Sequence, residues 1–272
     1  MGSGIRTDAY KVAEGEKVDL GRWPPGVTAG FHGSEAQALV ESRKLTLDLE
    51  RLQETLYAEH KHKLLVILQA MDTGGKDGTI KKVFEGVNPQ GVRVAHFRAP
   101  TPEEAGHDFL WRAHRQTPES GEIVIFNRSH YEDVLIERVH KHITSQECSR
   151  RYKDINHFER LLREDRTVIL KFFLHIDKAE QKRRLEDRLT DPSKQWKFSL
   201  SDVQERRFWG EYKKAYEDTI QNTSTRHSPW YVVPSNKKWF RDLLVSSIIV
   251  KTLQKLGMEY PRVSVDPKSI PI

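Results

Sequence analysis

The chain has 272 residues, of which 37% are hydrophobic and 31% charged, and no apolar run approaches the ~20 residues that cross a membrane. This composition indicates a globular protein with no membrane partner. Its formal net charge of +6 suits an anionic partner such as nucleic acid, a nucleotide or another polyanion. The N-terminal residues MGSGIRTDAY lack the apolar core of a signal peptide, and the single Cys148 cannot form an internal disulfide. We therefore expect a cytoplasmic protein.

The first part of the chain is predicted to contain an arm and one long helix. Residues 1–33 combine glycine, proline and charged residues, and we expect an irregular arm there. Ser34 and Gln37 form a capping-box pattern at the start of a helix. Its apolar stripe consists of Leu45, Leu49, Leu52 and Leu56.

From residue 64 onward, short apolar runs alternate with helical patterns. The predicted strands are 64–68, 92–97, 122–126, 167–176 and 230–235. The predicted helices are 76–85, 102–114, a helix from about 131, then 144–163, 177–190, 201–220 and a last helix capped by Asn236. The segment 258–272 is rich in proline and predicted to be an extended tail.

This alternation predicts one α/β domain over residues 1–272, with a parallel sheet covered by helices on both faces. Such sheets bind ligands at the carboxyl ends of their strands. Three segments with suitable chemistry follow strand ends: 69–79, 127–133 and 177–188.

The loop AMDTGGKDGT at 70–79 resembles the phosphate-loop pattern G-x-x-x-x-G-K-[ST] with two changes. Gly75 and Lys76 match, whereas Ala70 replaces the first glycine and Asp77 replaces the hydroxyl residue. Glycines at 74, 75 and 78, a helix start and a lysine supply what a phosphate site needs. Asp72 and Asp77 are oxygen donors that could replace the missing hydroxyl toward Mg²⁺. An ordinary glycine-rich turn is the alternative, and the buried strand before the loop argues against it.

The stretch FNRSHYEDVLIER at 126–138 carries the second group of candidate residues. Asn127 stands where phosphate-loop enzymes often have an acid that supports Mg²⁺. Glu132 and Asp133 follow at the helix start, and Arg128 suits bidentate phosphate binding. The alternative is that the two acids only favour the helix N-terminus and that Arg128 is a surface charge.

Residues 181–214 concentrate basic side chains and are predicted to form a lid. Arg184 and Arg188 share one helix face, and the following TDPSKQWKFS segment adds Lys194 and Lys197. A flexible basic segment beside a phosphate site is typical of a closing lid, whereas a solvated helix face is the alternative. Trp196 is expected to be a core or hinge anchor, not a base-stacking platform.

The motifs MDTGGKDGTIKKVFEGVNPQGVRV, FNRSHYEDVLIERV and DPSKQWKFSLSDVQER together resemble the polyphosphate kinase 2 family, over about residues 10–258. The version FNRSHYEDVL is similar to its class III subgroup. The resemblance implies a P-loop kinase-like fold with a helical lid, Mg²⁺ dependence, and a homodimer or homotetramer. It also implies transfer of phosphoryl groups between inorganic polyphosphate and both nucleoside mono- and diphosphates.

With the resemblance, the candidate residues receive roles. Catalysis is assigned to Asp72, Lys76, Arg128 and Asp133, and metal binding to Asp72, Glu132 and Asp133. Nucleotide and phosphate binding is assigned to Gly74, Gly75, Asp77, Gly78, Thr79, Asn127 and Glu132. Polyphosphate binding is assigned to Lys81, Lys82, Arg184, Arg188, Lys194 and Lys197. Gly74 departs from the serine that the family pattern leads us to expect.

The sequence thus predicts a polyphosphate-dependent kinase that acts reversibly on AMP and ADP to give ADP and ATP. An acceptor phosphate is already ionised at pH 7, so alignment and charge neutralisation should dominate catalysis. Two alternatives remain open at this point. An ATP-dependent nucleotide or small-molecule kinase would share the loop. A nucleic-acid-binding module would share the basic surface, although no nucleic-acid motif is found and no such partner is expected.

Overall fold

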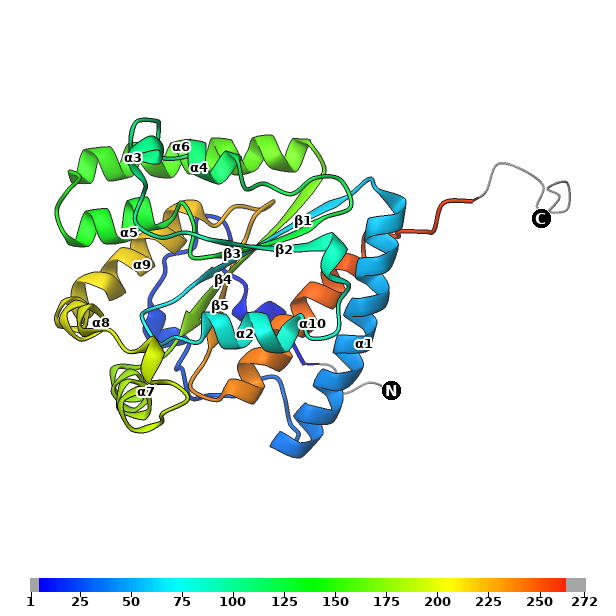
Figure 1. Ribbon diagram of the computed structural model, residues 1–272, viewed down its shortest axis with the longest axis horizontal. Helices are drawn as coiled ribbons and strands as arrows, with labels where there is room; N and C mark the ends of the chain where they lie inside the picture. Colours follow the sequence, from blue (N-terminus) through cyan, green and yellow to red (C-terminus); the bar gives the residue numbers. More distant parts are fainter. Residues whose placement is uncertain (1–4, 263–272) are drawn as a thin grey trace, which may run out of the picture.

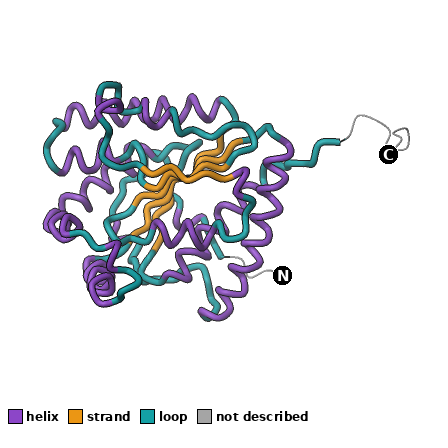
Figure 2. Tube along the Cα trace, viewed as in Figure 1, coloured by secondary structure: helices purple, strands orange, loops and turns teal. Residues whose placement is uncertain are grey.

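The computed structural model describes residues 5–262, and its centre is a five-stranded sheet. The strands are β1 Lys63–Gln69, β2 Val92–His96, β3 Ile123–Asn127, β4 Thr167–His175 and β5 Trp230–Pro234. All pairings are parallel, in the order β2-β3-β1-β4-β5. β1 is buried along nearly its whole length, as its continuous apolar run predicts. The five predicted strands are confirmed (Figure 2).

Helices cover both faces of this sheet (Figure 1). On one side lie α1 Glu35–Glu59, α2 Lys76–Val83 and α10 Lys238–Gln254. On the other lie α5 Glu132–Val139, α6 Ser145–Glu164 and α9 Trp209–Thr223. The predicted α/β fold with a covered parallel sheet is confirmed. No helix within residues 5–262 is long and apolar enough to span a membrane.

β1 lies between β3 and β4, so the connections after these neighbouring strands meet at one edge of the sheet. The chain leaves β1 toward β2 and β3 and later crosses to β4 and β5 on the other side. Ligands of open parallel sheets bind at such a reversal of strand order. The topology therefore brings the segments after β1 and β3 together.

The structure corrects three predicted helix boundaries. The helix expected over 102–114 is two short helices, α3 Pro102–Ala105 and α4 Trp111–His114, separated at Gly106. The helix expected over 201–220 is divided into α8 Leu200–Glu205, a 3₁₀ turn and α9. Asn236 does not cap α10, because its side chain exchanges hydrogen bonds with Asp177.

The N-terminal arm packs against the edge strand β5. Val12 N–H donates to the carbonyl of Trp230 at 2.9 Å, and Tyr10 is buried beside Phe240. The indole N–H of Trp23 donates to the carbonyl of Ala9. These contacts attach the arm to the sheet. Of the predicted tail at 258–272, residues 263–272 lie outside the described residues.

The lid segment, defined as residues 181–214, begins in α7 Lys178–Thr190. It continues through a 3₁₀ turn at Gln195–Lys197 into α8 and the start of α9. Figure 1 shows α7 and α8 beside the end of the sheet from which the loop before α2 emerges. The predicted helical lid is therefore adjacent to the loop at 70–79.

Candidate active site

The loop between β1 and α2 has a backbone that only particular residues allow. Gly75 is the N-cap of α2 and has φ +104°. A Cβ atom there would lie 2.1 Å from Nη1 of Arg241, which is almost fully buried behind the loop. Thr73 also has a left-handed φ of +60°. Strained backbone of this kind is maintained only where its surroundings determine it.

Arg184 supplies part of that support. Its guanidinium donates to the carbonyl of Thr73 at 2.9 Å and to the carbonyl of Ser235. The side chain is buried, 7% exposed, and also pairs with Glu180. Arg184 therefore holds the loop from behind and does not line the pocket. Its predicted role as a polyphosphate contact does not fit this position.

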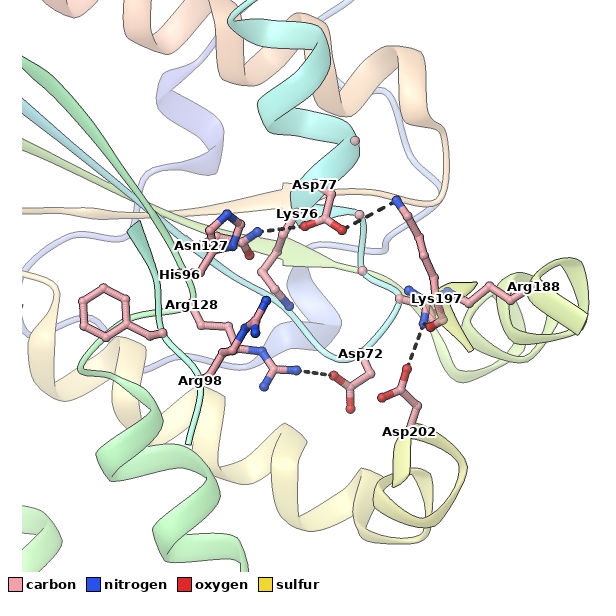
Figure 3. Close-up of a pocket in the computed structure, with 15 residues that line it drawn as sticks. Asp72, Lys76, Asp77, His96, Arg98, Asn127, Arg128, Arg188, Lys197 and Asp202 are labelled. Carbon is pink, nitrogen blue, oxygen red and sulfur yellow. Dashed lines mark hydrogen bonds and ion pairs between the residues drawn. The ribbon is translucent and has the colours of Figure 1, made fainter. Parts of the chain in front are cut away.

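A pocket of about 440 Å³ opens between this loop, the ends of β2 and β3, and the lid segment. Its cationic lining consists of Lys76, Arg98, Arg128, Arg188 and Lys197. Its carboxylates are Asp72, Asp77 and Asp202. Figure 3 shows these side chains around one space. Cations brought together in this way favour an anionic ligand with several charges.

Lys76 and Arg128 form the centre of the cationic lining. Lys76 Nζ lies 3.4 Å from the carbonyl of Ala70. Burial lowers the pKa of Lys76, and the charge of Arg128 acts in the same direction. Arg128 has a left-handed φ of +60° and donates from Nη2 to Asp72 Oδ1 at 2.9 Å. An anion in the pocket would relieve the repulsion between the positive charges of Lys76 and Arg128.

Asp77 is held between the second motif and the lid. Asn127 Nδ2 donates to Asp77 Oδ1 at 2.7 Å, and Lys197 Nζ lies 3.7 Å from Asp77 Oδ2. Burial alone would raise the pKa of Asp77, but the Asn127 hydrogen bond and the charge of Lys197 hold it below its ordinary value. Asp77 is thus an ionised carboxylate at neutral pH.

The lid segment reaches the pocket through Arg188 and Lys197. Arg188 Nη1 donates to the carbonyl of Lys197 at 2.9 Å and to Asp202 Oδ2 at 2.8 Å. Lys194 instead pairs with Asp191 and does not line the pocket. Trp196 is 78% exposed, so its expected role as a core or hinge anchor is wrong.

A second cavity of about 190 Å³ lies beside the first. Asp72, Arg128 and Asp202 line both cavities. The second cavity adds Glu132 and the aromatic side chains of Trp209, Tyr212 and Tyr216. Burial raises the pKa of Glu132, although Arg128 and Lys76 oppose this. The Asp72–Arg128 pair therefore separates a mainly cationic space from a partly aromatic one.

The turn that carries Arg128 is anchored in the core. Tyr131 donates from its hydroxyl to Glu159 at 2.6 Å, and the fully buried Lys171 pairs with the same carboxylate at 2.6 Å. Ser129 Oγ accepts from Gln69 Nε2 and from Tyr131 N–H. Ser129, His130 and Tyr131 are all fully buried, whereas Arg128 lines the pocket.

Several predicted site residues lie elsewhere. Asp133 lines a different cavity from Glu132, where its carboxylate pairs with Arg112 at 3.1 Å. Neighbouring positions on a helix point in different directions, and here the two acids line different cavities. Thr79 is buried and bonds back to the carbonyl of Gly75. Lys81 and Lys82 are exposed on α2 outside the pocket lining.

Other residues that line the pocket were not among the predicted site residues. His96, Phe97 and Arg98 come from the end of β2, and Asp202 comes from α8. The rule that ligands bind at strand carboxyl ends applies equally to β2 and would have indicated the first three. Asp202 has no such signal, because only the folded lid brings it there.

A family model described as "Polyphosphate kinase 2 (PPK2)" matches residues 33–261. The chain belongs to the polyphosphate kinase 2 family. It is 53% identical to the AMP/ADP-polyphosphate phosphotransferase of Meiothermus ruber, over 93% of this chain and 95% of that one. It is 44% identical to the ADP-polyphosphate phosphotransferase of Rhodopseudomonas palustris, over 94% and 93% of the two chains.

Comparison with solved structures indicates the same family. A crystal structure of polyphosphate kinase 2 from Arthrobacter aurescens TC1 superposes with a TM-score of 0.95 and 42% identity. The match covers 98% of this chain and 95% of that one. The predicted family is confirmed, and with it the prediction of a phosphotransferase that uses polyphosphate. Of the alternatives, an unrelated nucleic-acid-binding module has no support in these comparisons.

Proposed function

We propose that this family member transfers the terminal phosphoryl group of inorganic polyphosphate to AMP and to ADP, reversibly. The observation that carries the proposal is the pocket at the loop, where five cationic side chains converge against three carboxylates. A chain with about one negative charge per unit needs several cations along its path. The acceptors are those in the printed name of the Meiothermus ruber relative.

The chemistry follows from the positions of the charges. The backbone N–H groups at the start of α2 and the side chain of Lys76 would bind the phosphoryl group to be transferred. Arg128 would bind the same group from the side of β3. The attacking oxygen of the acceptor is ionised at pH 7, so no strong base is required. The shared Asp72–Arg128 wall is the point at which phosphates of donor and acceptor would meet.

The residues present fit Mg²⁺. This ion is usually bound by one or two carboxylates together with substrate phosphates and water. Asp72 and Asp77 offer carboxylate oxygens on the pocket wall, and Glu132 does so in the second cavity. Within residues 5–262, no three His, Cys, Asp or Glu side chains lie together so that they could hold a metal ion. Binding through one or two carboxylates and substrate phosphates does not require such a cluster. When bound, the ion would neutralise charge on the phosphate oxygens; we withdraw Asp133 from the proposed ligands.

The lid residues would bind the donor chain. Lys197 pairs with Asp77 and Arg188 with Asp202 in this structure, so both cations lie at the pocket already. A polyphosphate could take over these contacts, since phosphate oxygens are strong acceptors for lysine and arginine. Closing of the lid would also exclude water that competes with the nucleotide as acceptor.

We also propose a homodimer or homotetramer in the cytoplasm. Helix α1 exposes Leu39, Val40 and Leu47 on its surface, which suits contact with another copy. The single Cys148 is free and buried, in keeping with a reducing compartment. Light scattering coupled to size-exclusion chromatography would give the mass; a monomer at micromolar concentration would contradict the oligomer.

A donor exchange tests the function. Purified protein with Mg²⁺ and ADP receives either polyphosphate or GTP as the sole phosphoryl donor, and nucleotides are separated by anion-exchange chromatography. We expect ATP with polyphosphate and far less with GTP. Product with GTP alone would favour an ordinary nucleotide kinase and contradict the proposal. In the same assay, Lys76→Ala should lose this product. Lys81→Ala is its matched control and should keep it, because this exposed lysine lies on α2 outside the pocket.

A further inference from the structure

Arg98 is a cation in the pocket that has no partner among the described residues 5–262. The side chain is exposed, and within residues 5–262 its guanidinium makes no hydrogen bond or ion pair. Figure 3 shows Arg98 and Arg128 directed into the same part of the pocket. Arg128 is neutralised by Asp72, and Lys197 by Asp77, whereas no carboxylate in the described part of the chain pairs with Arg98. An arginine left free among other cations is suited to bind an anionic ligand.

The backbone of Arg98 is held by a buried arginine. Arg112, 7% exposed, donates from Nη1 to the carbonyl of Arg98 at 2.8 Å. Its other nitrogen, Nη2, donates to Asp133 Oδ2 at 3.1 Å. The guanidinium also lies 5.6 Å from the ring centre of Phe97, the residue before Arg98. Arg112 therefore connects the end of β2 with the first turn of α5.

Asp133 is in turn held in place. Arg151 of α6 donates from Nη1 to the carbonyl of Asp133 at 2.9 Å and from Nη2 to Glu147 at 2.8 Å. Asp133 directly follows Glu132, which lines the second cavity. The chain of contacts Arg98–Arg112–Asp133 thus joins the loop after β2 to the helix that carries Glu132.

We propose that Arg98 binds a phosphate group of the polyphosphate chain and that Arg112, held by Asp133, is the positioning residue for Arg98. This inference rests on the proposed function, since it assigns a phosphate chain to the pocket. It also gives Asp133 a role other than metal binding. The three residues then act in series: Asp133 orients Arg112, Arg112 fixes the Arg98 backbone, and Arg98 alone contacts the ligand.

Variants of Arg112 and Asp133 would behave differently if these two residues only stabilised the fold. If Arg112 and Asp133 only stabilise the fold, their variants should lower the melting temperature and leave the KM of both substrates unchanged. If they position Arg98, their effect on KM should largely disappear once the Arg98 side chain is absent. Replacing Arg112 by an uncharged residue would leave the Asp133 carboxylate buried without a partner and risks unfolding. Asp133→Asn, which keeps shape and an acceptor oxygen, and Arg112→Lys are safer variants.

A double-mutant cycle decides between these accounts. KM for polyphosphate and for ADP, and kcat, are measured for Arg98→Ala, for Asp133→Asn, for Arg112→Lys and for each combined with Arg98→Ala. Loss of a charge-assisted hydrogen bond should raise the KM for polyphosphate by about 10- to 100-fold in Arg98→Ala. Arg98→Lys, which keeps the charge, should recover part of this. Arg112→Lys and Asp133→Asn should raise the same KM by less, and should add little in the Arg98→Ala background.

The matched control is Arg115→Ala. Arg115 follows α4, is exposed, pairs with Glu103 and does not line the pocket, so its variant should keep wild-type KM values. Unchanged KM values in Arg98→Ala would overturn the assignment of Arg98. Fully additive effects of the second substitution would overturn the positioning role.

Binding of polyphosphate to the full chain, measured by titration calorimetry without nucleotide, separates this inference from the proposed function. Weaker binding by Arg98→Ala supports the inference even if no phosphoryl transfer is detected. Normal turnover of polyphosphate by Arg98→Ala, with wild-type affinity, would contradict the inference and leave the proposed function standing.

Discussion

Lys76 lies at the centre of the pocket, beside Arg128 and the carbonyl of Ala70, and the charges of Asp72, Glu132 and Asp77 favour its protonated form. Lys76→Ala should lower kcat by at least ~10²-fold, since removal of one preorganised charge at a reacting group costs about that much. The melting temperature should stay within a few degrees, because the lysine lies in a pocket. Near-normal turnover would exclude Lys76 from the reaction.

Glu132 should reduce the stability of the ligand-free protein. Burial raises its pKa, so the folded chain holds its proton more firmly than the unfolded chain does. The free energy of unfolding therefore falls as pH rises from the pKa of Glu132 in the unfolded chain through its raised pKa in the folded chain. At higher pH it stays at the lower value. Glu132→Gln should raise the melting temperature at pH 7, and this gain should shrink near pH 4. Thermal melts across this range test the sign; a variant less stable at pH 7 would contradict it.

At the residue level, local sequence patterns identified some site residues and missed others for physical reasons. Lys76 and Asp72 lie next to a strand end, where the sheet alone determines their neighbourhood. Glu132 and Asp133 are adjacent in sequence, and only the packed helix shows that they face different cavities. Arg184 has the charge of a lid residue, but its burial against Thr73 depends on long-range packing.

The loop before α2 depends on Gly75 as a structural element. Gly75→Ala should reduce activity by at least ~10²-fold, because a side chain would meet both a φ of +104° and the guanidinium of Arg241. Gly210→Ala is the matched control, since a Cβ atom at Gly210 meets nothing within 4 Å. Kinetics and melting curves of both variants test this; an active Gly75→Ala enzyme would show that the loop can adopt another conformation.

The lid acts as a donor-binding element in this account. Arg188→Ala should raise KM for polyphosphate by about 10-fold and raise KM for the nucleotide less, because the charge-assisted contacts of Arg188 lie at the pocket. Added NaCl should weaken polyphosphate use in the same direction. Arg183→Ala is the control, since Arg183 lies on α7 but pairs with Glu180 and Asp187. Equal effects of both substitutions would argue against a specific role for Arg188.

The elements themselves were largely predictable. Short, mainly apolar runs identified all five strands, and the capping pair Ser34 and Gln37 identified the start of α1. The helix expected over 102–114 was wrong because Gly106 ends α3 early. Asn236 looked like a helix cap, but Asp177, which is 59 residues away, takes its hydrogen bonds. Competition from distant partners of this kind is invisible in a local pattern.

For the whole molecule, the strand order β2-β3-β1-β4-β5 places the ends of β1, β2 and β3 around one pocket and the lid over it. The alternation of strand and helix patterns along the sequence predicted the sheet. It did not show which side chains would reach the pocket from β2 and α8. The arrangement gives a phosphate chain several cations and gives the acceptor a second cavity across Asp72 and Arg128. The central claim is therefore direct transfer from polyphosphate to a nucleotide at this wall.

A time course with AMP tests that claim most directly. Purified protein, Mg²⁺, polyphosphate and AMP are mixed, and nucleotides are resolved at successive times. We predict that ADP appears first and ATP follows as ADP accumulates, with no product when polyphosphate is omitted. Phosphorylation of ADP with inert AMP would restrict the acceptor to the diphosphate. Absence of both products, from a folded protein that contains Mg²⁺ and polyphosphate, would contradict the account.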